Sequence, residues 1–236
     1  MDNQQFLQTI AASFKKFLQT HPNSNEKLKI LHKKIAEDIK NKLGESYNIK
    51  SYGIGDGKEG KMEGRYLEKT VDILVSKDEK NIAGIGVKFV MNNYSQNSNN
   101  YFENMLGETA NIRTNKKKYF QILILPEEMP YYTDKGKIKK WEKITSNNID
   151  KYAVLSRDNA DTYLHTPIKT LLFVVKFPDC DHDLIKTRAK YKKFYLELVD
   201  INIKVSNNIS GDFGEEMVLN DYESFIKKLA FCIKSI

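Results

Sequence analysis

Two strongly apolar runs, each with a single polar residue, constrain the fold of this chain most strongly. Residues 119–125 read Y-F-Q-I-L-I-L and end at a proline, and residues 171–177 read L-L-F-V-V-K-F before a second proline. Such runs are typical of strands buried on both faces, since a strand with one wet face would alternate apolar and polar residues. Strands of this kind lie inside a sheet that is covered on both sides. We therefore predict an α/β fold with a mixed central β-sheet flanked by helices.

A pair of alternating strands precedes these runs. Apolar residues occupy every second position over 71–75 and, after a polar turn at 76–81, again over 83–89. This period of two predicts a β-hairpin with one face toward the core. The opposite face carries one carboxylate, Asp72, and one amine, Lys88. An acid and a lysine on neighbouring strands can hold a divalent metal and orient a water, which phosphodiester hydrolysis requires.

The remaining patterns predict the elements around this sheet. Apolar residues recur every three or four positions over 2–21 and 24–43, which predicts two N-terminal helices, the second ending at Gly44. The same spacing from Phe102 to Ile112 predicts a helix after the hairpin. Further along we expect a loop over 126–136, a basic helix over 138–144, a short strand over 152–155, a basic helix over 184–198 and a closing helix over 215–233.

Composition and cysteine usage limit the kinds of protein that this chain can be. Apolar residues make up 40% of the chain and charged residues 29%, which is ordinary for a globular protein. No repeat or linker marks a boundary, so we expect one domain over 1–236, with N-terminal helices in 1–45, a core with the hairpin in about 46–125 and a C-terminal part in about 126–236. Cys180 and Cys232 show no metal-type spacing and predict a reducing cytoplasm. No stretch resembles a membrane span or a secretion signal, so we expect no membrane partner.

The region of the hairpin resembles a nuclease pattern. An Asp in the first strand, an x-x-Lys in the second and a following helix with acids and amides resemble the PD-(D/E)xK nuclease superfamily. The wider block 87–113, V-K-F-V-M-N-N-Y-S-Q-N-S-N-N-Y-F-E-N-M-L-G-E-T-A-N-I-R, is similar to that of type II restriction endonucleases, and the match covers about a fifth of the chain. The resemblance implies a restriction-endonuclease-like fold, Mg²⁺, and sequence-specific cleavage of double-stranded DNA. A palindromic target further implies a homodimer.

Two positions depart from the pattern of the superfamily. Val71 replaces the usual proline before Asp72, which is a mild change. Gly86 stands where the family has Asp or Glu, and glycine has no side chain to bind a metal. In some members the acid lies on the following helix, which here offers Glu103 and Glu108. We favour Glu108, because the adjacent glycine leaves room for a metal. The resemblance thus implies Asp72 and Glu108 as metal ligands, Lys88 as the residue that orients the water, and Glu103 as the alternative acid. Three upstream acids are further candidates: Glu37, Glu63 and Glu68.

An alternative class is a catalytically inactive DNA-binding protein that keeps the nuclease fold, and Gly86 is the argument for it. In either class a polyanionic partner suits the net charge of +7 and the pI of about 9.1. We expect DNA contacts from the amide-rich stretch Asn92, Asn93, Tyr94, Ser95, Gln96 and Asn97, from Lys58, Lys61 and Arg65 in the glycine-rich stretch before the hairpin, and from Arg113. The alternatives are helix capping by the amides and an ordinary mobile loop for the glycine-rich stretch.

Overall fold

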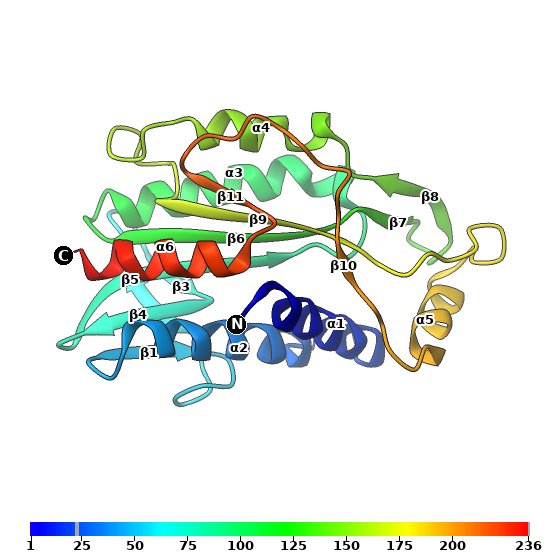
Figure 1. Ribbon diagram of the computed structural model, residues 1–236, viewed down its shortest axis with the longest axis horizontal. Helices are drawn as coiled ribbons and strands as arrows, with labels where there is room; N and C mark the ends of the chain where they lie inside the picture. Colours follow the sequence, from blue (N-terminus) through cyan, green and yellow to red (C-terminus); the bar gives the residue numbers. More distant parts are fainter. Residues whose placement is uncertain (22–23, 236) are drawn as a thin grey trace.

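The computed structural model describes residues 1–21 and 24–235, and its centre is a seven-stranded mixed sheet (Figure 1). The strands are β1 (Tyr47–Ser51), β4 (Ile73–Lys77), β5 (Lys80–Phe89), β6 (Lys118–Pro126), β9 (Lys169–Lys176), β10 (Lys204–Val205) and β11 (Met217–Leu219). Their order is β1-β4-β5-β6-β9-β10, and β11 also pairs with β9. Neighbours from β1 to β5 are antiparallel, whereas β5, β6 and β9 are parallel. The predicted α/β fold with a mixed central sheet is confirmed.

The two apolar runs form the middle of this sheet. β6 lies between β5 and β9, and every residue from 119 to 126 is buried. Ile122 and Ile124 belong to the larger hydrophobic cluster on one face, while Leu123 and Leu125 belong to a second cluster on the other. Successive side chains of a strand point to opposite faces, so this strand needs an apolar cover on each side.

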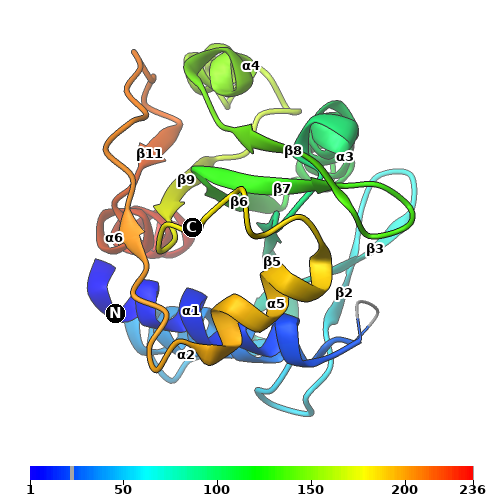
Figure 2. The same cartoon turned by 90° about the vertical axis from the view of Figure 1, so that its right-hand side faces the viewer.

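Helices supply both covers. α1 (Asn3–Gln19), α2 (Glu26–Leu43) and α6 (Tyr222–Lys234) lie on one face, and α3 (Tyr94–Arg113) and α4 (Ser146–Ser156) lie on the other (Figure 2). Phe6 of α1 stacks on Tyr222 of α6 and meets Phe173 of β9 edge-on, so aromatic rings join these helices to the sheet. Gly44, with a φ of +96°, ends α2 as predicted. None of the described helices is both long and apolar enough to cross a membrane.

Two small hairpins lie outside the central sheet, and one of them corrects the sequence analysis. β2 (Gly60–Glu63) pairs with β3 (Glu68–Val71), and β7 (Glu128–Tyr132) pairs with β8 (Ile138–Lys143). The predictions of a loop over 126–136 and a helix over 138–144 are therefore wrong. The two segments satisfy each other's backbone hydrogen bonds, and this pairing outweighs the helical preference of the lysines in β8.

The C-terminal third differs from the prediction in three further places. Residues 152–155 lie within α4 rather than in a strand, because Ile149, Tyr152 and Leu155 recur every three positions and pack into the second cluster. The basic helix is shorter than expected: α5 (Arg188–Glu197) begins after Thr187, whose side chain accepts a hydrogen bond from the Lys190 N–H. The closing helix begins at Tyr222, and β11 occupies part of the expected range.

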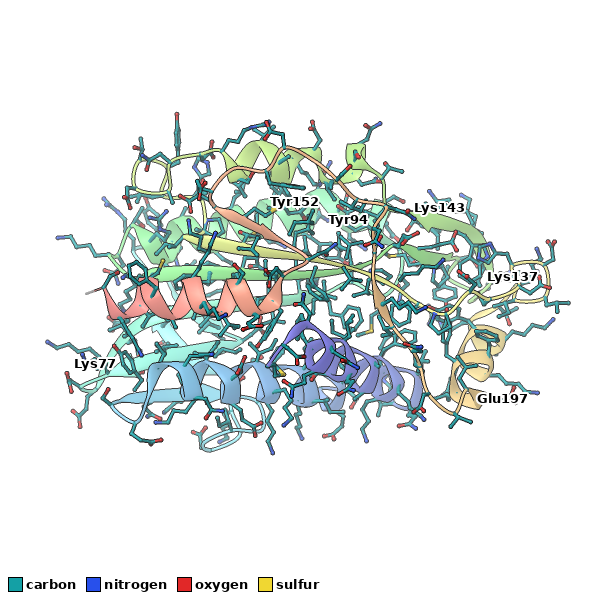
Figure 3. All side chains as sticks on the ribbon, viewed as in Figure 1. Lys77, Tyr94, Lys137, Lys143, Tyr152 and Glu197 are labelled. Carbon is teal, nitrogen blue, oxygen red and sulfur yellow. The ribbon has the colours of Figure 1, made fainter. Side chains whose placement is uncertain are left out.

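The amide-rich stretch after the hairpin is largely helical. α3 begins at Tyr94, directly after Asn93, which has a left-handed backbone with a φ of +50°. The Asn93 side chain accepts a hydrogen bond from the Tyr132 N–H and donates one to the Tyr132 carbonyl, so it ties the start of α3 to β7. Tyr94 is 2% exposed and lies beside Tyr152 of α4 (Figure 3). The prediction that Tyr94 contacts DNA is therefore wrong, because its ring belongs to the core.

Candidate functional site

The hairpin of β4 and β5 places Asp72 and Lys88 at the same end of the sheet. Asp78 and Glu79 form the turn with positive φ angles, and Ile73 pairs with Ile85. Asp72 directly precedes β4, and its Oδ2 accepts a hydrogen bond from the Val87 N–H at 2.6 Å. The Asp72 carboxylate is thus fixed against the residue that precedes Lys88.

Three of the predicted catalytic side chains line one pocket. Asp72, Lys88 and Glu108 border a hollow of about 450 Å³ together with Tyr101 and other residues. The Lys88 Nζ lies 4.2 Å from the centre of the Tyr101 ring. Surrounding side chains shield this amine from water and lower its pKa, while the charges of Asp72 and Glu108 act in the opposite direction. The lysine therefore sits in the field of both acids.

Glu108 is held firmly, and Glu103 lies elsewhere. The Lys69 Nζ is 2.7 Å from Glu108 Oε1, and the Tyr119 hydroxyl donates to Glu108 Oε2 at 3.1 Å. Burial, with the charges of Glu108 and Asp72, raises the pKa of Tyr119 well above its usual value, so the hydroxyl stays protonated. Glu103 is exposed and borders a neighbouring hollow. Of the two acids on α3, the structure brings Glu108 into the pocket of Asp72 and Lys88.

Two residues that the sequence patterns did not single out, His32 and Glu59, also lie close to Asp72. His32 of α2 places its Nδ1 3.9 Å from Asp72 Oδ1, and Glu59 comes from the loop between β1 and β2. The ligand atoms of His32, Glu59 and Asp72 all lie within 4.8 Å of one another. His32 is 1% exposed, and neither of its ring nitrogens has a hydrogen-bond partner among the described residues. A nitrogen and two carboxylates meeting in this way fit a divalent metal.

The pKa shifts within this cluster also fit a site for a cation. Burial, and then the charge of Asp72 and a hydrogen bond to it, raise the pKa of Glu59 to about 7, while a hydrogen bond from Tyr52 opposes the shift. Burial lowers the pKa of His32, and the charge of Asp72 opposes this. A proton shared by the two carboxylates relieves their repulsion. A bound cation would do so too.

Two side chains of β6 leave little room for a side chain at Gly86. A Cβ atom at residue 86 would stand 2.5 Å from the Tyr119 hydroxyl and 2.7 Å from Gln121 Oε1. Gln121 lies opposite Gly86 in the register of β5 and β6. Polar groups of β6 therefore occupy the space that an acidic side chain would need. The second carboxylate beside Asp72 is Glu59, which comes from the glycine-rich loop.

No sequence pattern marks Glu59, and His32 gives a weak one. The three acids considered upstream pair with lysines instead: Glu37 with Lys33 and Lys34, Glu63 with Lys117, and Glu68 with Lys61. His32 follows Leu31 in the buried stripe of α2. The sequence signal for a functional role of His32 was therefore a polar residue at a core-facing position. The loop that carries Glu59 reaches Asp72 only through the tertiary fold.

The predicted DNA contacts divide into exposed and buried residues. Lys58, Lys61 and Arg65 are exposed, as are Ser95 and Gln96, while Asn92 and Asn97 are half-buried. Ser95 donates a hydrogen bond to Glu142, and Asn97 hydrogen-bonds Tyr101. Arg113 is buried and donates to the Thr166 carbonyl at 2.6 Å. The prediction that Arg113 contacts DNA is therefore wrong, because its guanidinium ties α3 to the loop before β9.

Comparison with known proteins finds no matching family model, no similar curated protein and no similar solved structure.

Proposed function

We propose that this protein is a metal-dependent nuclease that hydrolyses phosphodiester bonds. The observation that carries the proposal is the convergence of His32 and Glu59 on Asp72, which lines the same pocket as His32 and Lys88. The restriction-endonuclease-like arrangement, cleavage of double-stranded DNA at a specific sequence, a homodimer and a cytoplasmic location are finer proposals. The first three rest on the resemblance of residues 70–113 to the superfamily, and the location rests on Cys180 and Cys232.

The donor set also bears on the choice of metal. The resemblance implies Mg²⁺, which prefers oxygen ligands. An imidazole favours a transition metal, and His32 is oriented toward Asp72 without another partner among the described residues. We therefore propose that Mn²⁺ binds more tightly than Mg²⁺ at this cluster, with Glu108 outside it.

The chain's own residues would divide the chemistry between them. A bound divalent metal would supply a Lewis acid that polarises the phosphate and lowers the pKa of a water. The Val87 N–H fixes the Asp72 carboxylate, which would hold the cation together with His32 and Glu59. The Lys88 amine, positioned over Tyr101, would donate a hydrogen bond to the phosphate oxygens as negative charge grows on them. Glu108, balanced by Lys69, would keep Lys88 protonated through its charge.

The test is cleavage of labelled DNA by purified protein with Mn²⁺, with Mg²⁺ or with a chelator. We expect cutting with Mn²⁺ and none with the chelator, and we expect Asp72→Asn and Lys88→Ala to lower the rate about a hundredfold or more. Lys77→Ala is the matched control, since Lys77 lies at the far end of the same hairpin (Figure 3). Equal cutting by Lys88→Ala and Lys77→Ala would remove Lys88 from the mechanism.

The second candidate is the inactive DNA-binding protein, which Gly86 favours. The same experiment separates the two functions. DNA that is retarded in a gel but stays intact with Mn²⁺ would support the binding protein and contradict the nuclease.

A further inference from the structure

The loop between β2 and β3 exposes two large side chains next to each other. Tyr66 is 77% exposed and Leu67 is 58% exposed. Isolated exposed apolar residues are common. Here an aromatic and an aliphatic side chain lie next to each other at the tip of a hairpin, where their contact with water is unfavourable and they add nothing to the core. The surroundings of this loop indicate what the pair is for.

A buried asparagine of α3 holds the loop in place. The Asn111 Oδ1 accepts hydrogen bonds from the N–H groups of Tyr66 at 2.9 Å and Leu67 at 3.4 Å, and its Nδ2 donates to the Leu67 carbonyl at 2.9 Å. The Arg65 N–H donates to the Asn111 carbonyl at 2.8 Å. A Cβ at Gly64 would overlap the Asn111 side chain, so only glycine lets the loop approach this closely. The loop presents Tyr66 and Leu67 from a fixed backbone.

The loop borders a hollow that continues the candidate active site. This second hollow, of about 440 Å³, is lined by Tyr66 and Leu67 at one end. It shares Asn104 and Glu108 with the pocket of Asp72 and Lys88. A Cβ at Gly107 of α3, which lines it, would meet no atom within 4 Å, so the surface there is open. A chain bound at Lys88 can therefore extend past Glu108 toward Tyr66.

An exposed cation lies beside the ring of this loop. The Arg65 guanidinium lies 5.7 Å from the centre of the Tyr66 ring, whereas Lys69, which borders the hollow together with Glu103, is paired with Glu108. An aromatic face beside cationic side chains is the combination that binds single-stranded nucleic acids, because bases stack on the ring and phosphates meet the cations. Inside an intact duplex both faces of every base are covered by neighbouring base pairs. Stacking on Tyr66 thus requires an unpaired base.

We propose that Tyr66 and Leu67 form a stacking platform for an unpaired base of the substrate, next to the phosphate at Lys88. This rests on the proposed nuclease function, but it replaces intact double-stranded DNA as the substrate by nucleic acid with single-stranded nucleotides at the cleavage site. Asn111 is a positioning residue for the platform. The platform and the metal cluster lie on different elements, so each can be tested without the other.

Binding to labelled oligonucleotides in a chelator tests the platform without cleavage. We expect the protein to bind a single strand more tightly than the blunt duplex of the same sequence, and Tyr66→Ala to weaken single-strand binding about fivefold to a hundredfold. Tyr66→Trp should restore it, since any aromatic ring can stack. Tyr163→Ala is the matched control, because Tyr163 is a half-exposed tyrosine at 49% outside both hollows.

The outcomes separate this proposal from the nuclease itself. Equal single-strand affinity of Tyr66→Ala and wild type would overturn the platform, as would a preference for the blunt duplex that Tyr66→Ala leaves unchanged. Cleavage with Mn²⁺ in the same preparation would then still support the nuclease. A loss of affinity in Tyr66→Ala that Tyr66→Trp reverses, in a protein that cuts nothing with Mn²⁺, would keep the platform and remove the nuclease.

Discussion

At the scale of single residues, His32 and Glu59 carry groups whose environment the rest of the protein does not satisfy. A buried polar group without a hydrogen bond costs about 1–3 kcal/mol, and His32 leaves two such nitrogens among the described residues. Glu59 is pressed against a second carboxylate, Asp72. Both costs fall when a cation binds between them. We therefore predict a separate effect of replacing each residue in the metal-free protein.

Replacing His32 by leucine should separate metal binding from folding. Leucine fills similar space without unmet polar atoms, so the metal-free variant should melt at the wild-type temperature or above it. The rise in melting temperature that Mn²⁺ gives the wild type should disappear, because a ligand is lost. Thermal unfolding with and without Mn²⁺ measures both effects, with His165→Gln as a control at a half-buried histidine outside the cluster. An undiminished Mn²⁺ effect in His32→Leu would exclude the cluster as the metal site.

The raised pKa of Glu59 predicts a pH-dependent stability. Between about pH 4.5, the ordinary value, and pH 7, the folded state holds this proton while the unfolded state releases it, so the contribution of Glu59 to stability falls as pH rises. Glutamine cannot ionise. Glu59→Gln and wild type should therefore be about equally stable at pH 5, and the variant should melt several degrees higher at pH 8 without metal. Melting curves across this range check it, and parallel curves would contradict the pairing of Glu59 with Asp72.

At the scale of elements, the pairing of β5 with β6 decides which residues can reach the site. Gly86 lies opposite Gln121, and Tyr119 extends from the same strand to Glu108. The side chains of β6 have taken the space of an acid on β5. The hairpin thus keeps Asp72 and Lys88 while the second carboxylate comes from a loop.

Placing an acid at Gly86 should destabilise the protein. Gly86→Asp must displace the Tyr119 hydroxyl and Gln121, and such overpacking costs about 1–3 kcal/mol. We expect a lower denaturant midpoint and no gain in cleavage. Gly107→Ala is the matched control, because its Cβ meets nothing within 4 Å and alanine stabilises a helix by up to about 1 kcal/mol. A stable and more active Gly86→Asp variant would contradict this prediction, because it would show that the Tyr119 and Gln121 side chains of β6 can move aside.

At the scale of the whole molecule, the charge excess and the shape of the surface bear on the partner. The net charge of +7 favours a polyanion without choosing between DNA and RNA. The exposed cations nearest the proposed substrate path are on the glycine-rich loop and the β2–β3 hairpin. Lys61 is already paired with Glu68 at 2.7 Å, which leaves Arg65 as the stronger contributor.

Nucleic acid binding should weaken with salt in a way that Arg65 influences. The logarithm of the affinity falls linearly with the logarithm of the salt concentration, and Arg65→Ala should reduce that slope by about one phosphate contact. Lys61→Ala should change it less, because Glu68 neutralises this lysine. Titrations of a single-stranded oligonucleotide at several salt concentrations measure the slope. Equal slopes for Arg65→Ala and wild type would show that Arg65 does not contact a phosphate of the bound strand.

The sequence by itself determined the layers of the fold and one half of the site. The apolar runs of β6 and β9 predicted the buried strands, and the alternation around Asp72 and Lys88 predicted their hairpin, because these patterns act between residues close in the chain. Only the tertiary structure decided that β7 and β8 pair, that Tyr94 and Arg113 are buried, and that His32 and Glu59 meet Asp72. Apart from the β7–β8 hairpin, whose strands follow each other in the chain, those contacts join segments far apart in sequence. Their free energy comes from packing and burial, which no local pattern records.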